Sequence, residues 1–234
     1  MGILRSWPMM VAAFIVGLTL PTLQAAETPV GPLHRAAAAG NLTEVKRLIA
    51  DGMPADERDA QRRPPLLLAV EGGHDAIAKA LLDAGASPNA QADNRDTPWL
   101  LAGAKGRTEM LAVMLAAGPD LSIRNRFGGN ALIPACERAH VDTVRLLLGT
   151  AIDVNHVNDL GWTCLLEAVI LGDGGPRHQT VTQLVLEAGA DPNHADREGL
   201  TPLDHARRRG QEAVARLIGA AGGRSGAAAP SGQR

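Results

Sequence analysis

The stretch Thr201-Pro202-Leu203-Asp204-His205-Ala206 occurs in variant form six times along this chain of 234 residues. Its leucine is the last of six anchor residues, which are Leu33, Leu66, Trp99, Leu132, Leu165 and Leu203. Successive anchors are 33 residues apart, except for the last step of 38. A fixed period of this size indicates one supersecondary unit that buries its apolar face against its neighbours. The sequence therefore predicts an elongated stack of six units.

Two small residues recur at fixed positions after each anchor. Three residues after it stands an alanine in every unit, which predicts that a neighbouring helix packs too close for a larger side chain. Seven residues after it stands a glycine, replaced only by Ala139, and this position suits the left-handed cap that ends a helix. These residues are Ala36, Ala69, Ala102, Ala135, Ala168 and Ala206, and Gly40, Gly73, Gly106, Gly172 and Gly210.

A second helix and an extended loop complete each unit. Apolar residues such as Val144, Leu147 and Leu148 recur at helical spacing and predict an amphipathic helix. A further glycine and a stretch rich in Asn, Asp and Pro then follow, which is turn chemistry. Before the first helices of units three and six, the pairs Thr97-Pro98 and Thr201-Pro202 suit the cap and first turn. The unit is predicted to be helix, turn, helix and loop.

On these residues the chain resembles ankyrin repeats, whose signature is Thr-Pro-Leu-His-x-Ala on a 33-residue period. The resemblance implies an all-α solenoid of helix-turn-helix units joined by extended, β-hairpin-like loops. The six units are residues 29–58, 59–91, 92–124, 125–157, 158–195 and 196–222. In units four and five Ala131 and Cys164 replace the proline, and Ala151 replaces the loop glycine of unit four. We expect repeat four to be the least regular.

The two ends of the chain lie outside the repeats. Residues 1–25 contain Arg5 and then the apolar run Met9 to Leu20, which is too short to span a bilayer as a stable helix. This pattern predicts a secretory signal peptide, with a retained N-terminal anchor as the alternative, and hence a periplasmic or secreted protein. Residues 223–234 are rich in Gly, Ala, Ser and Pro and are expected to form a disordered tail.

Charge and aromatic content argue against nucleic acid as a partner. The net charge of −2 is mild, no basic stripe appears, and tyrosine is absent. Three aromatic residues remain after the signal segment, namely Trp99, Phe127 and Trp162, too few for a platform that stacks bases.

The two cysteines, Cys136 and Cys164, are candidates for a disulfide because an oxidising compartment permits one. Cys136 lies four residues after its anchor, and Cys164 lies one residue before its own. Helix axes about 10 Å apart, with a five-residue offset at about 1.5 Å per residue, exceed the reach of a disulfide. We therefore expect two free, buried thiols.

The resemblance implies that partner contacts come from loop tips and from the exposed ends of first helices. At these positions repeat five carries large apolar residues, with further apolar residues and arginines in repeats four and six. An apolar centre with an arginine border is the composition of a protein-binding hot spot. In the alternative interpretation, an inserted loop covers Ile170 and Leu171 as local core. The candidate residues are Phe127, Leu160, Trp162, Ile170, Leu171, Leu200, Arg126, Arg138, Arg197 and Arg208.

No catalytic constellation, metal set or cofactor motif is present in the sequence. The insertion in repeat five, within Gly172 to Gln179, lacks the lysine and hydroxyl residue of a phosphate-binding loop. We therefore expect a monomeric, non-catalytic scaffold or adaptor that binds another protein through repeats four to six. The alternative is an accessory factor that handles a metal, haem or small ligand for a periplasmic enzyme, using His156, His178 and His194.

Overall fold

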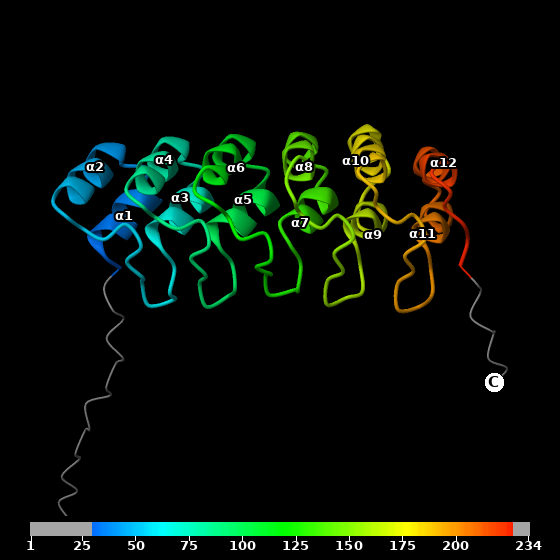
Figure 1. Ribbon diagram of the computed structural model, residues 1–234, viewed down its shortest axis with the longest axis horizontal. Coiled ribbons are helices and arrows are strands. Elements are labelled where there is room, and N and C mark those ends of the chain that lie inside the picture. Colours follow the sequence, from blue (N-terminus) through cyan, green and yellow to red (C-terminus); the bar gives the residue numbers. More distant parts are fainter. Residues whose placement is uncertain (1–29, 227–234) are drawn as a thin grey trace, which may run out of the picture.

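The computed structural model describes residues 30–226, so the predicted signal peptide at residues 1–25 lies outside the described residues. Twelve α-helices form six pairs along this part of the chain (Figure 1). Their bounds are α1 (Pro32–Ala38), α2 (Leu42–Ala50), α3 (Pro65–Gly72), α4 (Asp75–Asp83), α5 (Pro98–Lys105), α6 (Thr108–Leu115), α7 (Leu132–Glu137), α8 (Val141–Leu148), α9 (Cys164–Ile170), α10 (Pro176–Glu187), α11 (Pro202–Arg208) and α12 (Glu212–Ala220).

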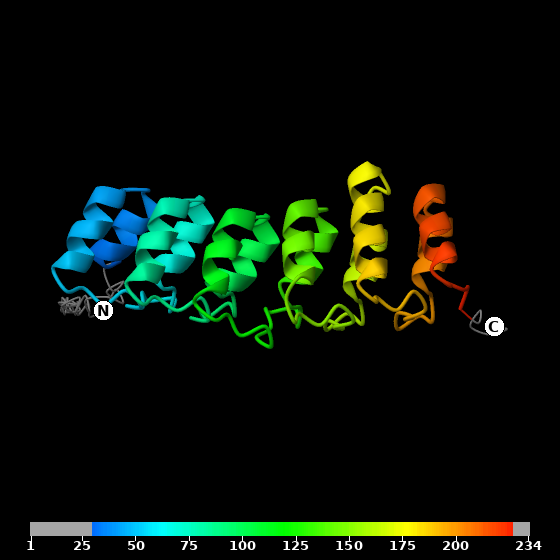
Figure 2. The same ribbon diagram turned by 45° about the horizontal axis from the view of Figure 1, so that its top comes forward.

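The helices form two parallel rows, as Figures 1 and 2 show. Odd-numbered helices make an inner row, from which the extended loops project on one side, and even-numbered helices make an outer row. Each helix packs against its partner and against the same row of the next repeat. Between residues 30 and 226 there is no strand, and the predicted all-α solenoid is confirmed. Over the same residues, no helix combines the length and hydropathy needed to cross a bilayer.

The repeated residues form the core and the helix starts, as their positions predict. All six anchors and all six alanines are buried between the rows. At the start of α5, the Thr97 hydroxyl accepts a hydrogen bond from the amide of Leu100 at 3.1 Å. Thr201 and Asp204 form a reciprocal capping box at the start of α11. Sequence and structure therefore agree on where α5 and α11 begin.

The glycines that end the inner helices adopt the predicted left-handed conformation in four repeats. In repeat four Ala139 takes the same conformation, with φ of 49°. Gly172 does not adopt it, so that prediction is wrong for repeat five. The positive φ lies instead at Gly174, because the inserted residues lengthen the turn between α9 and α10.

Asparagine side chains join successive repeats at the ends of the outer helices. Asn89 donates to the carbonyl of Gly118 at 3.2 Å and accepts from the amide of Asp120 at 2.7 Å. Asn155 and Asn193 make the same pair of bonds to repeats five and six. We call this arrangement the asparagine clamp.

Between repeats three and four the asparagine clamp is missing, because Ser122 stands at the clamp position. Its hydroxyl bonds Asp120 of its own repeat at 2.6 Å. The hydroxyls of Thr108 and Thr143, 2.7 Å apart, connect α6 and α8 at this junction. One neutral hydrogen bond between outer helices therefore stands where Asn89, Asn155 and Asn193 make two clamp bonds at their junctions. Between repeats one and two, Asp56 stands at the clamp position and accepts from the amide of Ser87 at 3.0 Å.

Repeat four departs from its neighbours at the start of its inner helix. α7 has six residues. Ala131, which stands where the other repeats have the helix-start proline or Cys164, already has a helical backbone. The side chain of Asn130 caps the helix instead, since its oxygen accepts from the amides of Leu132 at 3.1 Å and Ile133 at 3.3 Å. The irregularity expected for repeat four is present.

Cys136 and Cys164 form a disulfide between α7 and α9, with their Cα atoms 5.6 Å apart. The prediction of two free thiols is wrong. It used the distance between helix axes, but Cα atoms lie about 2.3 Å from each axis, so facing residues come closer than the axes do. The disulfide also shows that the last turn of α7, which holds Cys136, lies beside the first turn of α9, which begins at Cys164. Buried Ala135 and Ala168 leave room for this close approach.

Residues 223–226 do not belong to a disordered tail, contrary to the sequence prediction. The carbonyl of Arg224 accepts from the Thr201 hydroxyl at 2.8 Å, and the amide of Gly226 donates to Asp204 at 2.8 Å. The segment therefore folds back over the start of α11 and bonds to the two residues of its capping box. Residues 227–234 lie outside the described residues.

Candidate partner-binding surface

Two asparagines shape the loop tips of repeats four and five. The side-chain oxygen of Asn125 accepts from the amides of Phe127 and Gly129, each at 2.9 Å. The oxygen of Asn158 accepts in the same way from Leu160 at 2.9 Å and Trp162 at 3.0 Å. Sequence reasoning missed both asparagines, although an Asn at the start of a turn is a signal for this local bonding.

The tips hold apolar side chains in solvent. Phe127 is 55% exposed and Leu160 is 50% exposed. The tips are joined to each other, since the amide of Asp159 donates to the carbonyl of Phe127 at 2.9 Å. Arg126 lies over the Phe127 ring, with its guanidinium carbon 4.7 Å from the ring centroid. Arg197 of repeat six donates to the carbonyl of Asp159. Four predicted site residues therefore form one continuous row, which we call the tip cluster: Arg126, Phe127, Leu160 and Arg197.

The ends of the inner helices carry a second group of predicted residues. Leu171 follows α9 and is 51% exposed, so the inserted loop does not cover it. Ile170 is half-buried. Arg138 donates to the carbonyl of Ala104 at 2.8 Å, and Arg208 is exposed at the end of α11. This arrangement favours a surface over local core at Leu171.

Trp162 and Leu200 are less exposed than the tip residues. Both are half-buried at the base of their loops, where the carbonyl of each accepts a backbone hydrogen bond that closes the loop. We therefore regard Trp162 and Leu200 as supports for the tips instead of as main contacts.

A groove connects the tip cluster to the helix ends at repeats three and four. It has a volume of about 220 Å³ and an apolar floor that includes Leu101 and Pro134. Phe127 lines it from the loop side and Arg138 from the helix side. Arg126 also lines it and pairs with Asp96 at 3.4 Å.

Glu167 is a buried carboxyl group beneath this surface. Its Oε1 accepts from the Asn158 side chain at 2.8 Å, which ties the tip of repeat five to α9. Burial raises the pKa of Glu167 to about 7, the charge of Glu137 acts in the same direction, and the Asn158 hydrogen bond opposes them. The inner face of repeats four and five therefore gains negative charge as the pH rises through neutrality.

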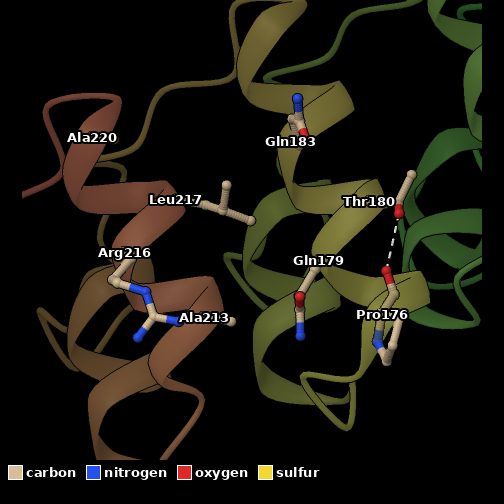
Figure 3. Close-up of a pocket in the computed structure, with 8 residues that line it drawn as sticks. All are labelled: Pro176, Gln179, Thr180, Gln183, Ala213, Arg216, Leu217 and Ala220. Carbon is tan, nitrogen blue, oxygen red and sulfur yellow. Dashed lines mark hydrogen bonds between the residues drawn. The ribbon is translucent and has the colours of Figure 1, made fainter.

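A second groove lies between the outer helices of repeats five and six, with a volume of about 620 Å³. Figure 3 shows Gln179, Leu217 and Arg216 among its lining residues. The insertion contributes to it, because α10 has 12 residues and begins at Pro176, which lines one end. None of the predicted partner-binding residues lines this groove.

The three histidines proposed for a metal or haem are engaged in hydrogen bonds to backbone carbonyls. His156 bonds Gly128 at 2.6 Å, and His194 lies 3.4 Å from the carbonyl of Gly161. His178 bonds the carbonyl of Glu137 at 3.0 Å and the carboxylate of Asp173 at 2.7 Å. Within the described part of the chain, no three His, Cys, Asp or Glu residues are grouped to hold a metal.

The family profile described as ankyrin repeats (3 copies) matches residues 10–92 and 99–196. The ankyrin repeat protein YahD of Escherichia coli (strain K12) is 43% identical over 188 residues, which are 80% of this chain and 94% of that protein.

Two solved structures share the fold. An ankyrin repeat domain from Acinetobacter baumannii AYE has a TM-score of 0.80 and 45% identity, covering 82% of this chain and 98% of that one. The ankyrin repeat domain of Bcl-3, a member of the IkappaB protein family, has a TM-score of 0.73 and 30% identity. That alignment covers 83% of this chain and 87% of the Bcl-3 chain.

Proposed function

Because the chain belongs to the ankyrin repeat family, we propose that it is a non-catalytic adaptor that binds another protein through repeats four to six. Ankyrin repeats are generally protein-interaction modules, and the tip cluster and Leu171 supply the contact surface here. The exposure of Phe127, Leu160 and Leu171 carries the proposal. These three are the most exposed large apolar side chains of residues 30–226, and they fall in two adjacent repeats. Exposed apolar surface gathered in this way is typical of interaction sites.

The surface is also held in place before any partner arrives. The asparagine hydrogen bonds fix the tips, and the disulfide fixes α7 against α9 beneath them. A preordered surface loses less conformational entropy on binding, which favours affinity. The fold thus supports binding by a rigid face.

The experiment compares two double variants as baits in extracts of the source cells. F127S/L160S removes two apolar tips, and V113S/L115S removes two exposed apolar residues of α6 outside the surface. After cross-linking and mass spectrometry, proteins captured by wild type should be retained by V113S/L115S and lost with F127S/L160S. Urea melts confirm that both variants fold. Capture of the same proteins in the same amounts by both variants would refute the proposal.

We also propose that the protein acts in the periplasm or after secretion, as a monomer, once residues 1–25 are removed. The buried disulfide supports this location, since disulfides persist in oxidising compartments. Cell fractionation with the intact mass of the recovered protein tests it. A cytoplasmic protein that retains residue 1 would contradict this location.

A further inference from the structure

One register position on the inner row carries a line of exposed residues. It lies six residues after the anchor, at the C-terminal ends of α5, α7, α9 and α11. The residues there are Lys105, Arg138, Leu171 and Arg209, and we call them the basic ledge. The ledge runs along successive repeats, since these inner helices pack in order along the stack (Figure 1).

Each basic residue of the ledge reaches one repeat back along the stack. Lys105 donates to the carbonyl of Glu71 at 3.4 Å. Arg138 donates to Ala104 at 2.8 Å, and Arg209 to Gly172 at 3.3 Å. These bonds place positive charge at helix C-termini, which is favourable for the helix dipole. They also fix the direction of each side chain along the ledge.

The carbonyl bonds do not neutralise the ledge. Within residues 30–226 none of its three basic residues forms an ion pair with a carboxylate. Each guanidinium has five N–H donors, and the carbonyl contact uses one. Among nearby acids, Asp96 pairs with Arg126, and Glu167 is buried with its Asn158 contact. Glu137 precedes Arg138 on α7, and Asp173, which lines a pocket with Arg138, pairs with His178 at 2.7 Å.

Resting on the proposed function, we propose that the ledge binds an extended segment of the partner protein in which two carboxylates flank an apolar residue. The carboxylates pair with Arg138 and Arg209, and the apolar residue packs on Leu171 between them. We propose an acidic segment because its carboxylates would complement the positive charge of the ledge. Arginine guanidinium groups bind carboxylates in bidentate geometry. Leu171 interrupts the basic line and supplies the apolar contact.

The geometry of the stack sets the spacing in the partner. Neighbouring packed helices lie about 10 Å apart, and an extended chain rises about 3.3 Å per residue. One repeat therefore matches about three residues of an extended segment. The expected pattern is acidic-x-x-apolar-x-x-acidic.

The test uses three labelled peptides and the full protein, with binding measured by fluorescence anisotropy. The first peptide is Asp-Gly-Ser-Leu-Ser-Gly-Asp, and the others carry Lys or Ser in place of both aspartates. The aspartate peptide should bind at least tenfold more tightly than either comparison peptide. Its affinity should fall as the salt concentration rises, because salt screens exposed charges. Absence of binding by the aspartate peptide, or equal affinities for the three, would overturn the proposal.

Variants separate a ligand contact from a structural role. Arg138→Gln and Arg209→Gln each keep a donor for the helix carbonyl but remove the charge, and each should weaken aspartate-peptide binding at least fivefold. Leu171→Ser should weaken it as well. Arg216→Gln removes an exposed charge from α12, on the outer row, and should leave binding unchanged. Urea midpoints close to wild type confirm that the glutamine variants fold.

Wild-type affinity in both glutamine variants would overturn the assignment of the ledge. This failure is distinguishable from failure of the proposed function. Protein capture that depends on Phe127 and Leu160 can persist while the ledge binds no acidic segment. Conversely, the aspartate peptide can bind the ledge although F127S/L160S captures the same proteins as the wild type.

Discussion

Reduction of the disulfide between Cys136 and Cys164 should destabilise the protein strongly. The bond closes a loop with a sequence separation of 28 residues. The chain-entropy relation for a loop of this size gives about 3.6 kcal/mol at 25 °C. Both cysteines are buried in the core between α7 and α9, so reduction removes the cross-link while the packing side chains stay in place.

The assay is urea unfolding of the wild-type protein in oxidised form and after reduction. For the slope of about 1–3 kcal/mol/M that is typical of small proteins, the loss corresponds to a midpoint lower by roughly 1–4 M urea. The variant C136A/C164A serves as the control, since its midpoint should not respond to the reductant. Quantification of thiols in the unfolded protein verifies that the oxidised sample contains the bond.

Two results would refute this reasoning. If the denatured, oxidised protein contains two free thiols, then α7 and α9 are not joined. If the bond is present but the oxidised and reduced midpoints coincide, then loop closure does not limit the unfolded chain as the relation assumes.

Three further predictions concern other positions. Ala102→Leu or Ala168→Leu should each cost about 1–3 kcal/mol in urea melts by overpacking adjacent inner helices; a neutral effect would show that these alanines do not face a close neighbour. The pKa of Glu167 is raised to about 7 from 4.5, so its contribution to stability is fully present below pH 4.5 and is lost as the pH rises through 7; Glu167→Gln should flatten this decline between pH 5 and 8, and an unchanged pH profile would contradict the raised pKa. Arg95 has a φ of 64° on an exposed loop tip, so Arg95→Gly should stabilise the protein by roughly 1 kcal/mol while Arg95→Ala should not; equal melting curves for the two variants would count against backbone strain at this site.

The fold could be predicted from the sequence because one pattern is repeated six times. The alanine after each anchor is buried in all six copies, and a left-handed glycine ends the outer helix in every copy except repeat four, so the pattern can be recognised even where one copy departs from it. The prediction failed where a unit departs from the pattern. At Gly172 the insertion moves the left-handed residue to Gly174, and a register taken from the other repeats cannot show that shift.

The sequence predicted which residues the candidate surface contains, but not the hydrogen bonds and the disulfide that hold them in place. Large apolar residues at variable positions indicated Phe127 and Leu160, and both are exposed. The asparagines that hold their loops were missed, since Asn in a turn has many local roles. The disulfide was missed for a geometric reason, because it depends on how far two helices slide along each other, which residue spacing alone does not determine.

The missing asparagine clamp between repeats three and four has a consequence for the protein under tension. When the two ends of the solenoid are pulled, every junction carries the same force in series. The junction between repeats four and five has both a clamp and a covalent bond, whereas the junction at Ser122 has neither. The junction between repeats one and two, with Asp56 at the clamp position, also lacks both. The first rupture should therefore fall at a junction outside repeats four to six, such as the one between repeats three and four. Repeats four to six, which carry the exposed apolar tips, would remain folded as one block after the first rupture.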